Sequence, residues 1–190
     1  MWNVGLILLL GAAPAEQGPA SHLAVIRKAP DFSLTNQSGT RVRMQDLRGK
    51  VLLVSFIFTT CNGSCPATTH RMCQVQEELK KRVIPAGQVR LLSITLDPVR
   101  DTADVLRSYA QLYDCDLNCW DLLCGSPSEV GPVIASWGMW ARPAANGQLD
   151  HPSRVFLVDQ RARIREIYNL SFLRPQWVVD DIAALQREAP

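Results

Sequence analysis

One segment of this chain constrains its fold more than any other. Residues 51–58 are a run of eight mostly apolar residues, rich in β-branched and aromatic side chains. A run this short and this apolar is typical of a strand that is buried on both faces, at the centre of a largely parallel sheet. We therefore expect an α/β domain in which helices cover both faces of the sheet.

Strand and helix patterns alternate along the rest of the chain. Apolar residues recur at helical spacing at Met72, Val75, Leu79 and Val83, which predicts a helix from Pro66 to about residue 83. Further strands are expected at 89–96, 120–123, 154–158 and 163–168, and further helices at 101–113, from Pro127 onward and at 175–187. Polar turn residues at 36–39 predict an N-terminal β-hairpin. This order favours a mainly parallel sheet, with sites at the carboxyl ends of its strands.

Size and charge narrow the class of protein. The chain has 190 residues, which suits one compact domain, and 47% of them are hydrophobic. Twenty Lys and Arg residues stand against eighteen Asp and Glu residues, a formal net charge of +2. Since the positive charges form no basic block, we expect no nucleic-acid partner.

The first residues differ in character from the rest. An apolar run is followed by Ala13-Pro14-Ala15, a small-x-small pattern, so residues 1–15 are interpreted as a signal peptide, although Met1-Trp2-Asn3 lacks the usual positive charge. Residues 16–28 are interpreted as a linker and residues 29–190 as the domain. The apolar run is about half the roughly 20 residues that span a bilayer. We expect an exported, periplasmic protein that contacts a membrane only through a partner or an uncleaved N-terminus.

Two cysteines follow the buried run directly. Gly63 permits a tight turn between Cys61 and Cys65, and Pro66 is expected to be the first helical residue, with Cys65 at the cap. The helix dipole favours a thiolate by only about 0.3 to 1 kcal/mol, too little to ionise both thiols. A soft metal ion deprotonates its thiol ligands on binding. A structural or redox-active disulfide between the same cysteines remains an alternative.

A metal site would need a third ligand, and three histidines are candidates. His22 lies in the expected linker, and His70 lies about 140° around the helix from Cys65. His151 shortly precedes an expected strand and is the best candidate. Spacing alone supports it weakly, because a histidine there is often only a polar boundary residue.

Three motifs together resemble the SCO/SenC family over roughly residues 29–188. They are Thr59-Thr60-Cys61-x-x-x-Cys65-Pro66, then Asp97-Pro98-Val99-Arg100-Asp101-Thr102, then Asp150-His151 followed by Phe156-Leu157-Val158-Asp159. The resemblance implies a thioredoxin-like fold and a copper ion bound by Cys61, Cys65 and His151. Two thiolates and an imidazole suit Cu(I) and can also hold Cu(II).

The resemblance also implies a role and its alternatives. Family members help to build the dinuclear copper site of cytochrome c oxidase subunit II, by delivering copper, by reducing its cysteines, or both. We expect a copper chaperone acting on subunit II or another copper acceptor. The alternatives are a thiol-disulfide oxidoreductase with Cys61 and Cys65 as its catalytic pair and a thioredoxin-like reductant as a partner, or a copper or redox sensor. Whether the protein is an enzyme stays open.

Residues outside the three expected ligands carry further expectations. Asp97 ends a strand and is a candidate outer-shell or partner contact, or else a turn residue with Pro98. Arg100 and Asp101 are expected to form a surface pair and a helix cap. Four cysteines lie outside the family pattern, with a local Cys115–Cys119 disulfide left open and with Cys73 and Cys124 expected to be buried thiols. A cis peptide bond between His151 and Pro152 is also left open.

Overall fold

A computed structural model describes residues 22–82 and 87–188 of the chain. The strands are β1 (Arg27–Lys28), β2 (Ser33–Asn36), β3 (Arg41–Arg43), β4 (Val51–Ile57), β5 (Val89–Thr95), β6 (Trp120–Cys124), β7 (Arg142–Pro143), β8 (Leu149–Asp150), β9 (Val155–Val158) and β10 (Arg163–Tyr168). The helices are α1 (Ser64–Lys81), α2 (Ala103–Leu112), α3 (Pro127–Ser136) and α4 (Pro175–Arg187), with a short 3-10 helix at Met44–Leu47. The expected elements are thus present, and strand β1 and the β7–β8 hairpin are additions.

Across the described residues, eight strands form one sheet in the order β1-β10-β9-β4-β5-β6-β2-β3. Strands β4, β5 and β6 pair in parallel, as expected for the centre. The other pairings in this sheet are antiparallel, so the sheet is mixed rather than mainly parallel. Short turns explain the β2–β3 and β9–β10 pairings, because consecutive strands joined by a few residues can pair only antiparallel, whereas a parallel pair needs a long crossover. The antiparallel β1–β10, β2–β6 and β4–β9 pairings join strands that are distant in the chain.

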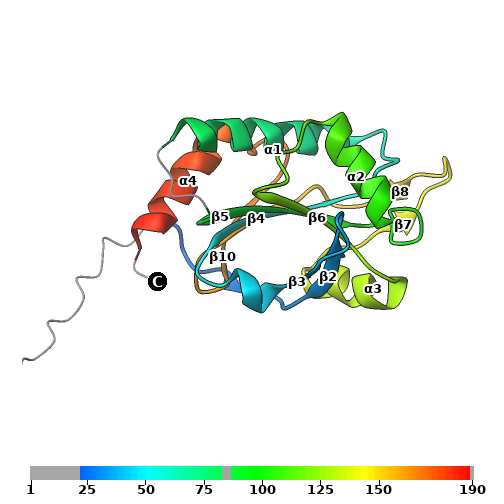
Figure 1. The fold of residues 1–190 in the computed structure, drawn as a ribbon, viewed down its shortest axis with the longest axis horizontal. Coiled ribbons are helices and arrows are strands. Elements are labelled where there is room, and N and C mark those ends of the chain that lie inside the picture. The colour runs from blue at the N-terminus through cyan, green and yellow to red at the C-terminus, as the bar shows by residue number, and fades with distance from the viewer. Residues whose placement is uncertain (1–21, 83–86, 189–190) are drawn as a thin grey trace, which may run out of the picture.

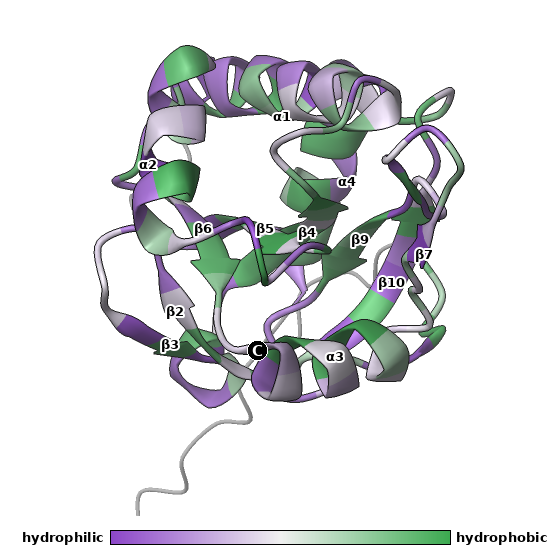
Figure 2. Cartoon of the chain, turned by 90° about the vertical axis from the view of Figure 1, so that its right-hand side faces the viewer, coloured by the Kyte–Doolittle hydropathy of each residue, from purple (hydrophilic) through white to green (hydrophobic). Residues whose placement is uncertain are grey.

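Strand β4 lies inside this sheet between β5 and β9, and all seven of its residues are buried. Helices cover both faces: α1, α2 and α4 lie on one side and α3 lies on the other (Figures 1 and 2). On the α3 side, the ring of Trp137 packs against Phe56 and Phe156 at centroid distances of 5.9 and 5.2 Å. The double burial predicted from residues 51–58 is confirmed.

The N-terminal part of the domain joins this sheet twice. The expected hairpin is present as β2–β3, and β2 pairs with β6. Strand β1 pairs with β10, so the end of the segment interpreted as a linker contributes to the sheet. The segment interpreted as a signal peptide lies outside the described residues. In the part of the chain that the structure describes, none of the helices has the length and apolar character needed to cross a membrane.

Helix α3 begins with a capping box. Ser126 donates its backbone N–H and its hydroxyl to Glu129, both at 2.8 Å, and Arg41 of β3 forms an ion pair with the same carboxylate at 2.8 Å. The backbone hydrogen bond from Ser126, followed by the bond from Arg41, holds the pKa of Glu129 at about 2. This carboxylate therefore links the hairpin to the helix.

The depressed pKa gives a pH prediction for Glu129→Gln. A depressed folded-state pKa contributes stability above the unfolded-state value of 4.5, and this contribution is lost as the pH falls toward 2. We expect the variant to unfold about 1 to 3 °C below the parent at pH 7, with the gap closing between about pH 4.5 and pH 2. Thermal unfolding followed by circular dichroism measures this. Glu78→Gln, which removes an exposed pairing with Lys81, is the control, and an equal pH response in both variants would contradict the assignment.

Candidate metal centre

The loop between β4 and α1 places both cysteines at the carboxyl edge of the central strands. The backbone N–H of Cys61 donates to the Phe58 carbonyl at 3.2 Å, which closes a turn directly after β4. The N–H of Gly63 donates to the Cys61 sulfur at 3.3 Å. Helix α1 begins at Ser64 with Gly63 as its N-cap, so Cys65 lies in the first helical turn and not at the cap as expected. Both sulfurs thereby lie beside the amino end of the helix.

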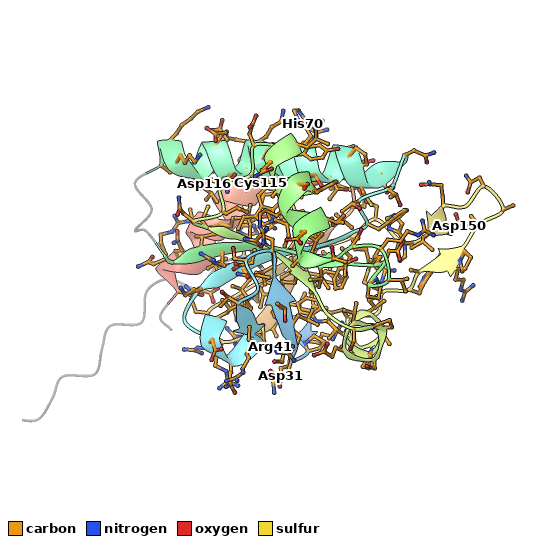
Figure 3. All side chains as sticks on the ribbon, turned by 45° about the vertical axis from the view of Figure 1, so that its right-hand side comes forward. Asp31, Arg41, His70, Cys115, Asp116 and Asp150 are labelled. Atoms are coloured by element: carbon orange, nitrogen blue, oxygen red, sulfur yellow. The ribbon has the colours of Figure 1, made fainter. Side chains whose placement is uncertain are left out.

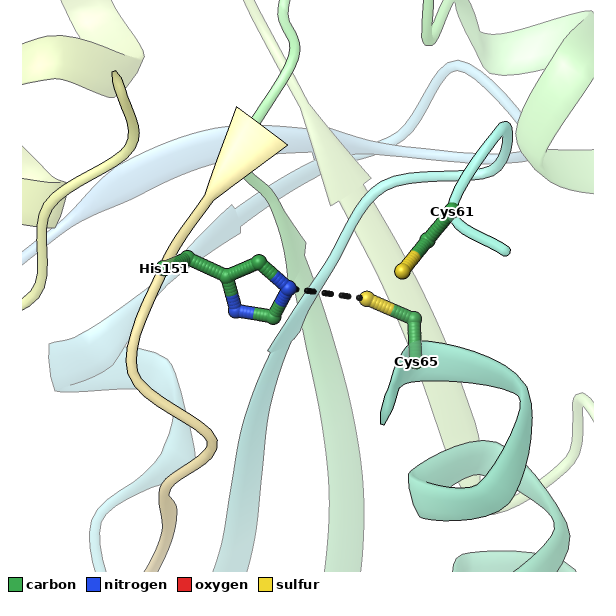
Figure 4. Close-up of side chains that lie close together, drawn as sticks. All are labelled: Cys61, Cys65 and His151. Carbon is green, nitrogen blue, oxygen red and sulfur yellow. Dashed lines mark hydrogen bonds between the residues drawn. The ribbon is translucent and has the colours of Figure 1, made fainter. Parts of the chain in front are cut away.

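His151 reaches the same place from a distant part of the chain. It directly follows β8, at the end of the β7–β8 hairpin that the sequence did not predict. Its Nε2 lies 3.5 Å from the Cys65 sulfur (Figure 4). The two sulfurs and a ring nitrogen of His151 lie within 4.8 Å of one another, and this group could hold a metal ion. The structure thus brings together the three residues singled out from the sequence.

The orientation of the His151 ring suits a ligand. Its Nδ1 lies 3.1 Å from the carbonyl oxygen of Pro152, which can only accept a hydrogen bond. Nδ1 therefore carries the proton, and the lone pair of Nε2 faces the cysteines. Phe58 packs edge-on against the ring at a centroid distance of 5.6 Å. The cis alternative at Pro152 is wrong, since the described residues contain no cis peptide bond.

The two sulfurs have different surroundings. Cys65 is 1% exposed, whereas Cys61 is only partly buried. Burial raises the pKa of the Cys65 thiol well above its ordinary value; a backbone hydrogen bond from Phe58 opposes this, and the neighbouring Cys61 adds to it. Cys65 therefore stays protonated at neutral pH, and a metal ion bound there would have to displace its proton. Cys61 offers the more accessible sulfur.

A buried carboxylate holds the start of the cysteine loop. Asp101 is 1% exposed and accepts hydrogen bonds from the hydroxyls of Thr59 and Thr95, both at 2.6 Å. Burial raises its pKa, and the bonds from Thr59 and Thr95 oppose this. The expectation that Asp101 caps a helix at the surface is wrong, since Thr102 caps α2 through a bond to Val105. Nothing in the sequence distinguishes the two roles, because an Asp-Thr pair before a helix is a common cap pattern.

A glutamine side chain joins the two halves of the site. Gln148 directly precedes β8. Its Nε2 donates to the Thr60 carbonyl at 3.2 Å, and its Oε1 accepts from the Asn62 N–H at 3.1 Å. These bonds lie on either side of Cys61. They tie the hairpin that leads to His151 to the loop that carries Cys61. No pattern in the sequence pointed to Gln148.

The remaining candidates lie apart from the three-residue group. Asp97 is at the carboxyl end of the β5 region, as expected, where its backbone carbonyl closes a turn and its carboxylate contacts Arg100 at 3.2 Å. The turn role is therefore shown, and an outer-shell role stays a prediction. His70 lies on the exposed side of α1 with its Nε2 3.2 Å from Gln74 Nε2 (Figure 3). His22 contacts Asp181 instead.

These features define a class of protein, a thioredoxin-like α/β domain with two thiols and an imidazole at the edge of its central strands. The sequence model of the SCO1/SenC family matches residues 21–187. The chain belongs to the SCO1/SenC family.

Relatives agree with this assignment. A SCO1 protein homolog of Bacillus subtilis is 33% identical over 141 residues, which are 73% of this chain and 72% of that protein. The structure of Bradyrhizobium japonicum ScoI with copper bound has a TM-score of 0.72 and 28% identity, and the match covers 83% of this chain and 99% of that chain. BsSco, described with a disulfide switch as a member of the Sco family of cytochrome c oxidase assembly proteins, has a TM-score of 0.74 and 29% identity, covering 86% of this chain and 96% of that chain.

The role of Asp101 predicts a stability effect. Asp101→Ala leaves the hydroxyls of Thr59 and Thr95 without this acceptor in a buried place, so we expect the free energy of unfolding to fall by about 2 to 3 kcal/mol. Asp104→Ala is the matched control, because that aspartate lies nearby in the first turn of α2, is 85% exposed and pairs with Arg107. It should change stability by less than about 0.5 kcal/mol. Urea denaturation measures both, and equal losses would argue against the role given to Asp101.

Proposed function

We propose that this protein is a copper chaperone in which Cys61, Cys65 and His151 bind one copper ion. The observation that carries the proposal is the convergence of two sulfurs and one imidazole nitrogen within 4.8 Å. Thiolate and imidazole ligands are soft or intermediate donors that suit Cu(I), and the nitrogen also allows Cu(II). The copper bound to the Bradyrhizobium japonicum relative supports the choice of metal.

The burial of the ligands fits a protein that releases its metal to another protein. Cys65 and the inward-facing ring of His151 are anchored by the fold, whereas Cys61 is partly exposed on its loop. An acceptor thiol or imidazole can approach the ion from the side of Cys61 and replace the ligands one at a time. Copper is thus the cargo of the protein and not a resident cofactor.

The proposed acceptor is the copper site of cytochrome c oxidase subunit II. The description of BsSco as one of the cytochrome c oxidase assembly proteins supports this choice. Such an acceptor lies outside the cytoplasm, which agrees with the apolar run and the small-x-small pattern at residues 1–15. We therefore propose a periplasmic location.

Thiol-disulfide exchange through Cys61 and Cys65 is the second candidate function, because the disulfide switch described for BsSco is a specific observation in its favour. Here Cys61, the more accessible of the two, would be the attacking sulfur and Cys65 would complete the disulfide. The raised pKa of Cys65 opposes a thiolate there. The two functions differ in their need for His151, which binds copper but is dispensable for dithiol exchange.

The copper ligands give the direct test. Reduced protein is expected to bind one Cu(I) per chain, and Cys61→Ser or Cys65→Ser should abolish binding in competition with a Cu(I) chelator. His151→Ala should weaken binding by more than about 100-fold, beyond the range for an outer-shell contact. His70→Ala, an exposed histidine on α1, should bind as the parent does. Full occupancy in either cysteine variant would refute the site.

A cellular assay then separates delivery from reduction. In a deletion strain grown at limiting copper, His151→Ala should fail to restore oxidase activity if the protein delivers copper. Restoration close to the parent level would favour the reductase function instead.

Gln148 gives a second prediction on the same site. Gln148→Leu removes both bonds around Cys61, so we expect Cu(I) affinity to fall by about 10-fold, the lower range for a contact that positions a ligand. Gln74→Leu, which changes a half-buried glutamine on α1 away from the three-residue group, is the matched control and should leave the affinity unchanged. Chelator competition measures both. Unchanged affinity in Gln148→Leu would show that the two hydrogen bonds of Gln148, here called the Gln148 clamp, are not needed for binding.

A further inference from the structure

Two cysteines that the copper site does not use lie together elsewhere in the molecule. Cys73 is on α1, and Cys115 is in the segment between α2 and β6. Both are partly buried against the core, so Cys73 is less buried than expected, while Cys124 is buried as expected. All six cysteines of the chain lie in described segments and are free thiols.

Hydrogen bonds fix this segment against α1 on both sides of Cys115. The Cys73 sulfur lies 3.3 Å from the Tyr113 carbonyl. One turn further along α1, Gln76 donates to the Asp116 carbonyl and accepts from the Asp116 N–H, both at 3.0 Å. Cys115 lies between these two attachments, and Figure 3 labels Cys115 and Asp116 next to α1.

The backbone reverses its direction just before Cys115. Asp114 has a positive φ of 52°, an uncommon conformation for a residue other than glycine. The N–H of Cys115 then donates to the Ala110 carbonyl at 2.9 Å, which ends α2 with a tight reversal. The reversal places Cys115 beside Cys73, close enough for the two thiols to shift each other's pKa.

The two thiols are not equivalent. The hydrogen bond from Cys115 lowers the pKa of Cys73, whereas the same contact, together with burial, raises the pKa of Cys115. Cys73 also lines a surface groove with His70, Glu77 and Tyr113, and Cys115 does not. Cys73 is thus the more acidic of the two thiols, and it faces a surface groove.

Other pairings fit the geometry less well. The Cys119 sulfur accepts from Gln76 Nε2 at 3.1 Å and lies 3.6 Å from the Asp116 carbonyl. The local Cys115–Cys119 disulfide that the sequence left open is absent, since both thiols are free, and Cys119 has partners of its own on Gln76 and Asp116. Cys73 is eight residues after Cys65 on α1, about 12 Å along the helix axis, which prevents direct exchange with the copper-site thiols.

We propose that Cys73 and Cys115 form a second, copper-independent dithiol that closes to a disulfide by exchange with a small disulfide such as oxidised glutathione. The Cys73 thiol loses its proton, and its thiolate attacks one sulfur of glutathione disulfide, forms a mixed disulfide and releases one glutathione thiolate. Cys115 then loses its proton and attacks the Cys73 sulfur, which breaks the mixed disulfide and releases the second glutathione thiolate. The two released protons return to the two thiolates, so two cysteines are oxidised and one disulfide is reduced.

The closed disulfide would join α1 to the segment after α2. It would tie residues 73 and 115 of one domain and constrain the helix whose first turn carries Cys65. A cross-link across a long loop disfavours the unfolded chain. We therefore expect oxidation to raise the unfolding temperature by about 5 to 10 °C.

Disulfide mapping tests the pairing. Purified copper-free protein is equilibrated in glutathione buffers, quenched with acid, alkylated, and digested with trypsin and an Asp-specific protease. Cleavage before Asp114, Asp116 and Asp121 separates Cys115, Cys119 and Cys124 onto different peptides. The expected product links the Cys73 peptide to the peptide that begins at Asp114, distinct from any Cys61–Cys65 product. This map needs no variant.

Variants supply the controls. Cys119→Ser should keep the cross-link and the rise in unfolding temperature, whereas Cys73→Ser and Cys115→Ser should lose both, each measured in a Cys61→Ser/Cys65→Ser background. A dominant Cys115–Cys119 product overturns the proposal. The proposal is also overturned if Cys73 and Cys115 stay reduced at every glutathione ratio tested, including ratios that fully oxidise Cys61 and Cys65 in the parent.

Discussion

The site depends on the hydrogen bonds that the buried carboxylate of Asp101 accepts. The carboxylate accepts hydrogen bonds from Thr59, just before the cysteine loop, and from Thr95, at the end of β5. The last residue pair of β4 and β5 is Ile57 and Thr95. Beyond this pair, the Asp101 carboxylate still connects the two chain segments through its bonds to Thr59 and Thr95. The loop that carries Cys61 therefore leaves the sheet from a fixed point. A charged group this deeply buried is retained only where its partners satisfy it.

From that point the site is assembled from separate parts of the chain. The β4–α1 loop supplies Cys61, the first turn of α1 supplies Cys65, and the segment after β8 supplies His151. Gln148 joins the loop to the hairpin, and the Pro152 carbonyl selects the tautomer of the imidazole. Each ligand is thus held by a contact of its own. The burial that keeps Cys65 protonated favours a metal ion that binds thiolate strongly enough to displace the proton.

Helix α1 connects this site to the second thiol pair. Cys65 is in its first turn, and Cys73 lies about two turns later, against the segment that follows α2. One cysteine of each pair therefore lies on α1, and the fixed rise of the helix keeps the two pairs apart. His70 lies on the exposed side of the same helix, away from both thiol pairs.

Much of this protein could be predicted from the sequence, because the relevant signals are local. The apolar run at residues 51–58, the Cys61 and Cys65 spacing, and the final helix from Pro175 to Arg187 all depend on neighbouring residues, and the structure contains each of them. Other features depend on residues distant in sequence. The mixed sheet, the burial of Asp101, the Gln148 clamp and the contact of Cys73 with Cys115 depend on which segments pack together. An aspartate before a helix looks the same whether its carboxylate faces water or a buried threonine, and only the tertiary structure decides between them.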